Sequence, residues 1–255
     1  MLLSILIPVY NERAVVERSL SLVLGAPLPE NRVLLFDGSD RLDVVQQEWV
    51  EARLGEWIGS VPRPGRVRLY ALTQDARALS AGFDRCNPGS GEDESFWVAN
   101  PGKLKRRWKS LFAAPADDAL QRLPSGPLER SPLLENLQIL AVRAQLEPGE
   151  AAARRSLLLV SDLLQHSEAF SHYTQGCADP AAFIASESFG RVRGDLRGLE
   201  IEVLYIQRER PAGCTVSDHV NWWDVVFEAS GADLVRVRSA PGTAPTEPGR
   251  RAVTP

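Results

Sequence analysis

The chain has 255 residues, a formal net charge of -4 and three cysteines, and these values exclude several classes of protein. Its 44% hydrophobic content is sufficient for the core of one large α/β domain. The small negative charge gives no electrostatic reason to expect nucleic acid or an anionic membrane as the partner. We therefore expect another protein or a small molecule.

The cysteines and the apolar N-terminus indicate the compartment. Cys86, Cys177 and Cys214 are odd in number and widely spaced, which fits neither a disulfide framework nor paired metal ligands, so we expect reduced thiols. Residues 1–9 are apolar but too few to cross a membrane, and no basic segment precedes them. The sequence thus predicts a cytoplasmic protein without a signal peptide.

The first predicted elements are a strand and a helix. Residues 3–10, LSILIPVY, form an apolar run, and apolar residues recur at helical spacing over residues 11–24. This opening resembles the first strand and helix of family 2 glycosyltransferases of the GT-A fold, in which ILIPVYNE begins the nucleotide-sugar site. The resemblance implies a nucleotide site that includes Tyr10, Glu12 and Asp37.

The glycosyltransferase resemblance covers residues 1–31 and does not continue through the chain. The sequence has no segment rich in asparagine and glycine after a third strand. It also has no apolar strand ending in the paired aspartates that hold metal and diphosphate in that family. We therefore expect residues 1–31 to be a strand and a helix appended in front of a different domain.

Two later apolar runs end in acidic residues. Residues 33–36, VLLF, lead into Asp37, and residues 156–160, SLLLV, lead into Asp162. Continuous apolar runs are typical of strands buried on both faces of a parallel sheet. The carboxyl ends of such strands meet at one edge, where ligands bind. Clustered carboxylates repel one another unless a cation lies between them, and oxygen ligands favour Mg²⁺.

The remaining segments alternate between helical and strand patterns. We expect an α/β fold of the doubly wound class, with a mostly parallel sheet and helices on both faces. Helices are predicted over residues 42–58, 103–123, 132–146, 180–197 and 217–230, strands over residues 66–72, 199–206 and 234–237, a surface loop over residues 84–102, and a disordered tail over residues 239–255.

Three segments of this α/β region resemble the loops of a known metal site. Asp37-Gly38-Ser39, the later hydroxyl of Ser131, and Asp162 in LLLVSDLLQHS are similar to the metal-ion-dependent adhesion site of von Willebrand factor type A domains. The resemblance covers residues 32–238. It implies that Ser39 and Ser131 ligate Mg²⁺, that Asp37 and Asp162 hold it directly or through water, and that an acidic side chain of a partner protein completes the site.

The chain departs from the type A pattern at two positions. Arg41 stands where the first loop usually has a second serine, and Leu163 stands where the third loop usually has a glycine. A metal-free type A scaffold is therefore an alternative. Ser131 is equally well placed to cap the helix that starts at Pro132, and both aspartates suit helix capping as well.

Other candidate sites receive weaker support. His166 and His172 lie in one loop, but no third ligand lies at zinc spacing. A basic run over residues 103–109 is either a solvated helix face or a docking site for an acidic partner. We predict a protein-interaction module that depends on a divalent cation and is not an enzyme, and the alternative is a family 2 glycosyltransferase.

Overall fold

The computed structural model describes residues 30–63, 65–74, 79, 81–91, 100–123, 126, 128–146, 154–177, 179–211, 214–241 and 253–254. The predicted strand and helix of residues 3–24, with Tyr10 and Glu12, lie outside the described residues. So does most of the predicted tail, although two of its residues form a short strand.

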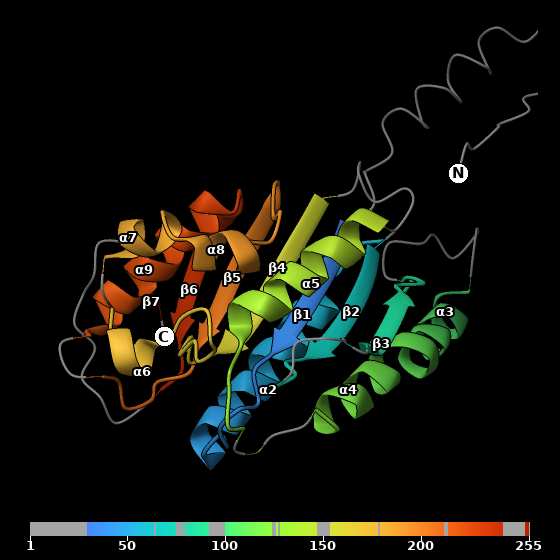
Figure 1. Cartoon of the computed structure of the whole chain (residues 1–255). Coiled ribbons are helices and arrows are strands. Elements are labelled where there is room, and N and C mark those ends of the chain that lie inside the picture. The colour runs from blue at the N-terminus through green and yellow to red at the C-terminus, as the bar shows by residue number, and fades with distance from the viewer. Residues whose placement is uncertain are drawn as a thin grey trace, which may run out of the picture.

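A seven-stranded sheet forms the centre of the molecule, in the order β3-β2-β1-β4-β5-β6-β7 (Figure 1). β3 is antiparallel to β2, and all the other neighbours are parallel, so the predicted fold class is confirmed. The strands are β1 (Glu30–Phe36), β2 (Gly65–Ala71), β3 (Ala81–Cys86), β4 (Arg154–Ser161), β5 (Leu199–Tyr205), β6 (Asp233–Ser239) and β7 (Val253–Thr254).

Helices cover both faces of this sheet (Figure 1). They are α2 (Val44–Gly59), α3 (Pro101–Trp108), the π-helix η1 (Lys109–Ala113), α4 (Ala114–Gln121), α5 (Leu133–Leu146), α6 (His172–Gln175), α7 (Pro180–Ile184), α8 (Glu187–Val192) and α9 (Val216–Ala229). Pro115 explains the π-helix, because it has no N–H to donate to the carbonyl four residues earlier, and Ala114 instead donates to Lys109 O.

Two hydrophobic cores hold the layers together. Successive side chains of a strand point to opposite faces, so Leu34 packs in the core beneath α2, η1 and α4, whereas Leu35 packs beneath α5, α7, α8 and α9. Both leucines are fully buried, as the continuous apolar run predicted. Burial of one such side chain contributes about 1.5–3 kcal/mol.

The sequence predictions missed some details of the secondary structure. β3 begins at Ala81 and overlaps the start of the predicted loop, because its alternation is too short to show. The single helix predicted over residues 180–197 is two short helices, since Ser186 caps a new helix by accepting from Phe189 N. β2 is also more buried than predicted, with Arg68 and Tyr70 nearly inaccessible.

The prediction of three reduced thiols is wrong. Cys177 forms a disulfide with Cys214, and Cys86 is free and exposed. The paired cysteines are 37 residues apart in sequence. Cys177 lies just after α6, and Cys214 precedes Thr215, which caps α9. The pairing depends on α6 lying beside α9, which the spacing of the cysteines does not reveal.

Candidate metal-binding site

The predicted site lies at the point where the winding of the sheet reverses. β1 lies between β2 and β4 in the sheet. The chain adds β2 and β3 on one side of β1 and then crosses to the other side to add β4. Asp37 directly follows β1, and Asp162 directly follows β4. A crevice at the carboxyl ends of such adjacent strands is the usual ligand position in open α/β sheets.

A pocket of about 310 Å³ opens at this edge. It brings together three of the four predicted metal ligands, Ser39, Ser131 and Asp162, and Asp37 lies directly behind them through a hydrogen bond to Ser131. The other lining residues are Asp40, Leu128, Glu129, Arg130, Leu164, His166 and Tyr173.

Asp37 is held by three hydrogen-bond donors. Ser39 N donates to Oδ1 over 3.1 Å, and the hydroxyls of Ser131 and Ser161 donate to Oδ2 over 3.2 and 2.7 Å. Asp37 is only 6% exposed. These three contacts hold the buried carboxyl group in one orientation.

Asp162 is a second buried carboxylate, and the structure gives it little compensation. Its Oδ1 accepts from Leu164 N over 2.8 Å, and the residue is 7% exposed. Burial and then the negative charge of Asp37 raise the pKa of Asp162 to about 7. Arg208 opposes this rise only weakly.

The negative charge of the site extends to its rim. Asp40 also raises the pKa of Asp162, and all three carboxylates contribute to the raised pKa of Tyr173, after burial. Within the described chain, no ion pair includes Asp37, Asp40 or Asp162. Arg130 lines the same pocket but pairs with Glu168 at 3.2 Å. Arg208 has the weakest influence on the pKa of Asp162. The site therefore concentrates negative charge that no described cation pairs with directly.

The side chains of Ser131 and Asp37 do not cap the helices that follow them. The Ser131 side chain donates to Asp37, and the α5 amide of Leu134 is instead bonded by Gln165 Oε1 over 3.0 Å. Asp37 accepts from Ser39 N, while α2 is capped by Asp43. Ser131 thus lies at the site with an oxygen that retains acceptor capacity.

The two departures from the type A pattern do not block the pocket. The Arg41 side chain is exposed and lines a separate groove between α2 and α4. Leu163 adopts a left-handed conformation, with φ of 62°, which explains why a glycine is usual at this position. Its side chain is fully buried in the core, which offsets the backbone strain.

Two side chains of α9 hold the strained loop in place. Trp223 Nε1 and His219 Nε2 both donate to Leu163 O, over 2.8 and 3.0 Å. Tyr205 Oη lies 3.1 Å from His219 Nδ1, which accepts from it in the neutral ring. These residues position Asp162 without touching the pocket. The sequence predicted only a helix over residues 217–230 at this place.

Two buried amides complete the support of the loops. Gln165 bonds Leu134 N, Glu135 Oε2 and Ser167 Oγ. Asn136 bonds Thr73 and the carbonyl of Pro132. Both amides are fully buried. Neither amide was predicted from the sequence, although Gln165 follows Asp162 by three residues and Asn136 follows Ser131 by five.

The histidines are not arranged as zinc ligands. His172 Nδ1 accepts from Gln165 N, and burial lowers the pKa of His172 to about 3. The His166 ring lies apart from it, against Ser171 and Tyr173. Among the described residues, no group of three or more His, Cys, Asp or Glu side chains has metal spacing.

The donor set nevertheless fits a hard divalent ion. Two carboxylates and two hydroxyls offer only oxygen, which Mg²⁺ prefers over nitrogen and sulfur. The carboxyl group of Asp162 has a raised pKa, so a cation beside it would favour its charged form. The Ser39 side chain lines the same pocket as Ser131.

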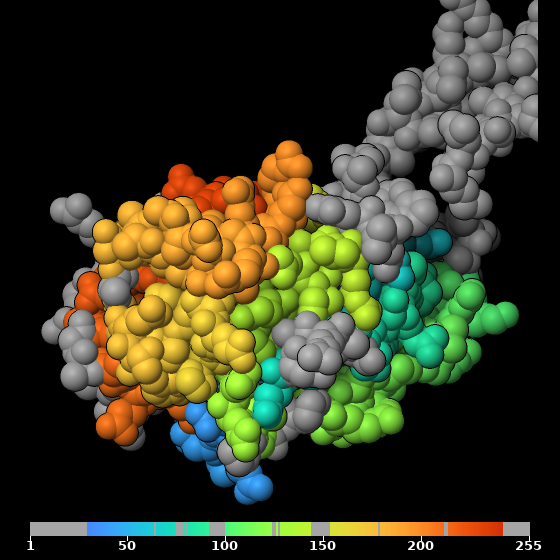
Figure 2. All heavy atoms as spheres, viewed as in Figure 1, coloured from blue at the N-terminus to red at the C-terminus, as the bar shows by residue number. Residues whose placement is uncertain are grey.

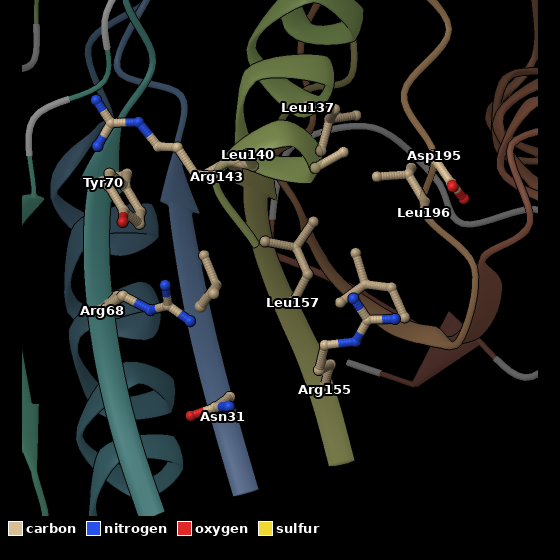
Figure 3. A pocket seen from close by; sticks show the side chains of 13 residues that line it. Asn31, Arg68, Tyr70, Leu137, Leu140, Arg143, Arg155, Leu157, Asp195 and Leu196 are labelled. Carbon is tan, nitrogen blue, oxygen red and sulfur yellow. The ribbon is translucent and has the colours of Figure 1, made fainter. Parts of the chain in front are cut away.

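A second pocket lies at the other end of the strands and of α5 (Figure 3). Arg68, Arg143 and Arg155 line it together with leucines of α5 and β4. Its volume is about 40 Å³, whereas one water needs about 10–15 Å³. It is too small for an organic ligand.

No protein-family profile and no curated protein matches the sequence. Among solved structures, the chain is similar to the VWA domain of SpRpn10, with 12% identity, a TM-score of 0.42 and coverage of 83% of this chain and 89% of that chain. It is also similar to a von Willebrand factor type A protein from Catenulispora acidiphila, with 14% identity, a TM-score of 0.44 and coverage of 84% and 39%. A third similar structure is BatB from Bacteroides thetaiotaomicron, with 11% identity, a TM-score of 0.33 and coverage of 82% and 90%.

Proposed function

We propose that the chain is a protein-interaction module that depends on a divalent cation, Mg²⁺, held by Asp37, Ser39, Ser131 and Asp162. The observation that supports this proposal most strongly is the pair of buried carboxylates at the switch point of the sheet, neither of which forms an ion pair with a described residue. Such a pair is costly unless a cation or a proton lies between its members.

In this proposal some residues orient the ligand side chains, and others bind the ion. Asp37 orients the Ser131 hydroxyl by accepting a hydrogen bond from it, so that the oxygen lone pairs of Ser131 are free for a cation. The loop after β4, held by His219 and Trp223, presents Asp162. A bound Mg²⁺ supplies an electrophilic centre that an acidic side chain of a partner protein completes.

The predicted partner belongs to this proposal, and the predicted location does not. No helix of the described residues is long and apolar enough to cross a membrane. We propose that the protein docks a partner through the rim of the pocket, where Tyr173 is 56% exposed. The cytoplasmic location was predicted from reduced thiols, and the disulfide between Cys177 and Cys214 argues against it, because such bonds are uncommon in reducing compartments.

Isothermal titration with Mg²⁺ tests the proposed site. We expect saturable binding to the wild type and its loss in Asp162→Ala, because that substitution removes one of the two carboxylates. Asp233→Ala is the matched control, since Asp233 is exposed at the far end of β6 and carries the same charge. Equal Mg²⁺ binding by Asp162→Ala and the wild type would overturn the proposal.

The same protein samples test the alternative function. A family 2 glycosyltransferase would use Tyr10, Glu12 and Asp37 around a nucleotide sugar, and of these only Asp37 lies in the described part of the chain. Titration with UDP and Mn²⁺ would then give binding that is insensitive to Asp162→Ala. That result would support the enzyme and contradict the interaction module.

A further inference from the structure

A cluster of exposed cations lies on one short helix, apart from the loops of the candidate metal site. We call it the basic surface, and it consists of Lys103, Lys105, Arg106, Arg107 and Lys109. All five side chains are exposed. α3 carries four of them, and η1 begins with the fifth. These helices lie beside β3, at the edge of the sheet, and their atoms form part of the molecular surface (Figures 1 and 2).

The spacing of these cations makes them repel one another. Lys103 and Arg107 are four residues apart, as are Lys105 and Lys109, and residues at this separation face each other on a helix. Like charges at that spacing destabilise a helix. The arrangement is therefore unfavourable for α3 itself.

The position of Lys103 along the helix is also unfavourable. α3, η1 and α4 run continuously from Pro101 to Gln121, and the basic surface occupies the first half of this run. The first turn of α3 contains no acidic residue, and Lys103 lies in it. The amino end of a helix carries partial positive charge, which favours acidic rather than basic side chains.

The described residues do not neutralise these charges by ion pairing. Among the residues that the structure describes, no ion pair includes a member of the basic surface. The sequence from Asn100 to Ala116 contains no acidic residue, although the whole chain has 33 acidic and 29 basic residues. The concentration of positive charge is therefore local and runs against the net charge of -4.

The basic side chains are not needed to anchor the helix. Phe112 does this, since it is fully buried and packs edge-on against Phe83 of β3 at 5.7 Å between ring centroids. Trp108 packs beside Phe112 on the same core. An unfavourable cluster without a structural task is expected where a protein binds a partner.

We propose that the basic surface docks an acidic segment of a partner protein. The cluster extends over seven residues of helix, which is about 10 Å at about 1.5 Å per residue, so it matches a short run of carboxylates. Leu111, which is 47% exposed, lies beside the cations and offers apolar contact. Carboxylates would relieve the repulsion among the five cations.

Nucleic acid fits the same surface less well. Its affinity depends on how many phosphates are neutralised along its length, and tight binders contact about 6–10 of them. The basic surface offers five cations, and Asp117 and Asp118 follow on α4. A longer polyanion would meet these acids, whereas a short peptide avoids them.

Fluorescence anisotropy with a labelled octaglutamate peptide tests this proposal. We expect salt-dependent binding that weakens at least about tenfold, or about 1.4 kcal/mol, in Lys105→Gln/Lys109→Gln. Arg191→Gln/Arg193→Gln removes the same charge from exposed positions around α8 and should leave binding unchanged. The measurement is made in EDTA, so it does not depend on the metal site.

Thermal unfolding of the same variants separates binding from folding. Lys105→Gln/Lys109→Gln should keep or raise the midpoint temperature, because it removes a repulsive pair. Three results would overturn the proposal: equal peptide binding by both double variants, no peptide binding by the wild type at low salt, or tighter binding of a single-stranded oligonucleotide of equal charge.

Discussion

Among the described residues, charged side chains form ion pairs at one end of the sheet, and two buried carboxylates at the other end do not. At the amino ends of the strands, acids and bases are paired: Arg32 lies 2.8 Å from Glu30, and Arg154 lies 2.7 Å from Glu200. At the carboxyl ends, Asp37 and Asp162 are buried together, and no described residue forms an ion pair with either.

This difference shows that the carboxyl ends of the strands are the less stable of the two regions. Exposed ion pairs such as Arg154 with Glu200 contribute only about 0–1 kcal/mol and leave a neutral surface. Buried like charges destabilise the folded state unless something binds between them. The carboxyl end is thus held in an unfavourable state by the surrounding structure, as is common at functional sites.

Removal of the disulfide should have the largest effect on the carboxyl end. Cys177→Ser frees α6 from the start of α9 and should lower the free energy of unfolding by about 4 kcal/mol, because the bond closes a loop of medium length. Denaturant unfolding measures this loss. Cys86→Ser is the control and should be neutral, and a wild type whose stability is insensitive to reductant would contradict the expectation.

Acid should destabilise the same region through two buried histidines. Burial lowers the pKa of His172 to about 3 and that of His219 to about 4, against an ordinary value near 6.5. Below about pH 6.5 the unfolded chain binds protons that the folded chain excludes, so stability falls as the pH falls.

The two histidines should together cost about 2–3 kcal/mol between pH 6 and pH 5. The raised pKa of Asp162 acts in the opposite direction over this range and offsets about 1 kcal/mol, so the net loss expected in the metal-free protein is about 1 kcal/mol. Denaturant unfolding at several pH values checks it. His219→Gln should remove about half of the histidine contribution while retaining a donor for Leu163 O. His166→Gln is the control, since that ring lies at the pocket rim. A stability that is flat over this range would contradict the account.

Asp162→Asn should stabilise the metal-free protein at pH 8. The folded pKa of about 7 is above the ordinary value of about 3.9, so stability falls as the pH rises from about 4 to 7. Asparagine removes the charge and retains the acceptor for Leu164 N. We expect a gain of about 2 kcal/mol in EDTA, below the ceiling of about 4 kcal/mol for such a shift.

Asp233→Asn provides the comparison for this gain. Asp233 is exposed on β6, so its substitution should change stability by less than about 0.5 kcal/mol. Equal effects of the two substitutions, or a loss of stability in Asp162→Asn at pH 8, would mean that the charge of Asp162 does not destabilise the metal-free protein.

The smallest effect is expected at Arg41. Its side chain lines the groove between α2 and α4 and not the pocket of Asp162. Arg41→Ala should therefore change both the free energy of unfolding and the Mg²⁺ affinity by less than about 0.5 kcal/mol. Calorimetric titration checks the affinity, and a much tighter Mg²⁺ site in the variant would show that Arg41 repels the ion.

The sequence predicted that the site residues lie close together, but it did not predict the contacts that hold their loops in place. Asp37 and Asp162 follow apolar runs, and parallel strands bring their carboxyl ends together, so the sequence predicted that the two lie close. The cap from Gln165 and the disulfide at Cys177 depend on packing between segments far apart in sequence. No local pattern encodes such contacts.

Proton release on Mg²⁺ binding tests the central claim most directly. If the ion binds beside Asp162, whose carboxyl group is about half protonated at pH 7, binding should release about half a proton at that pH and almost none at pH 9. Calorimetric titration in buffers of different ionisation enthalpy measures this number. Mg²⁺ binding without proton release at pH 7, or with the same release in Asp162→Asn, would contradict the account.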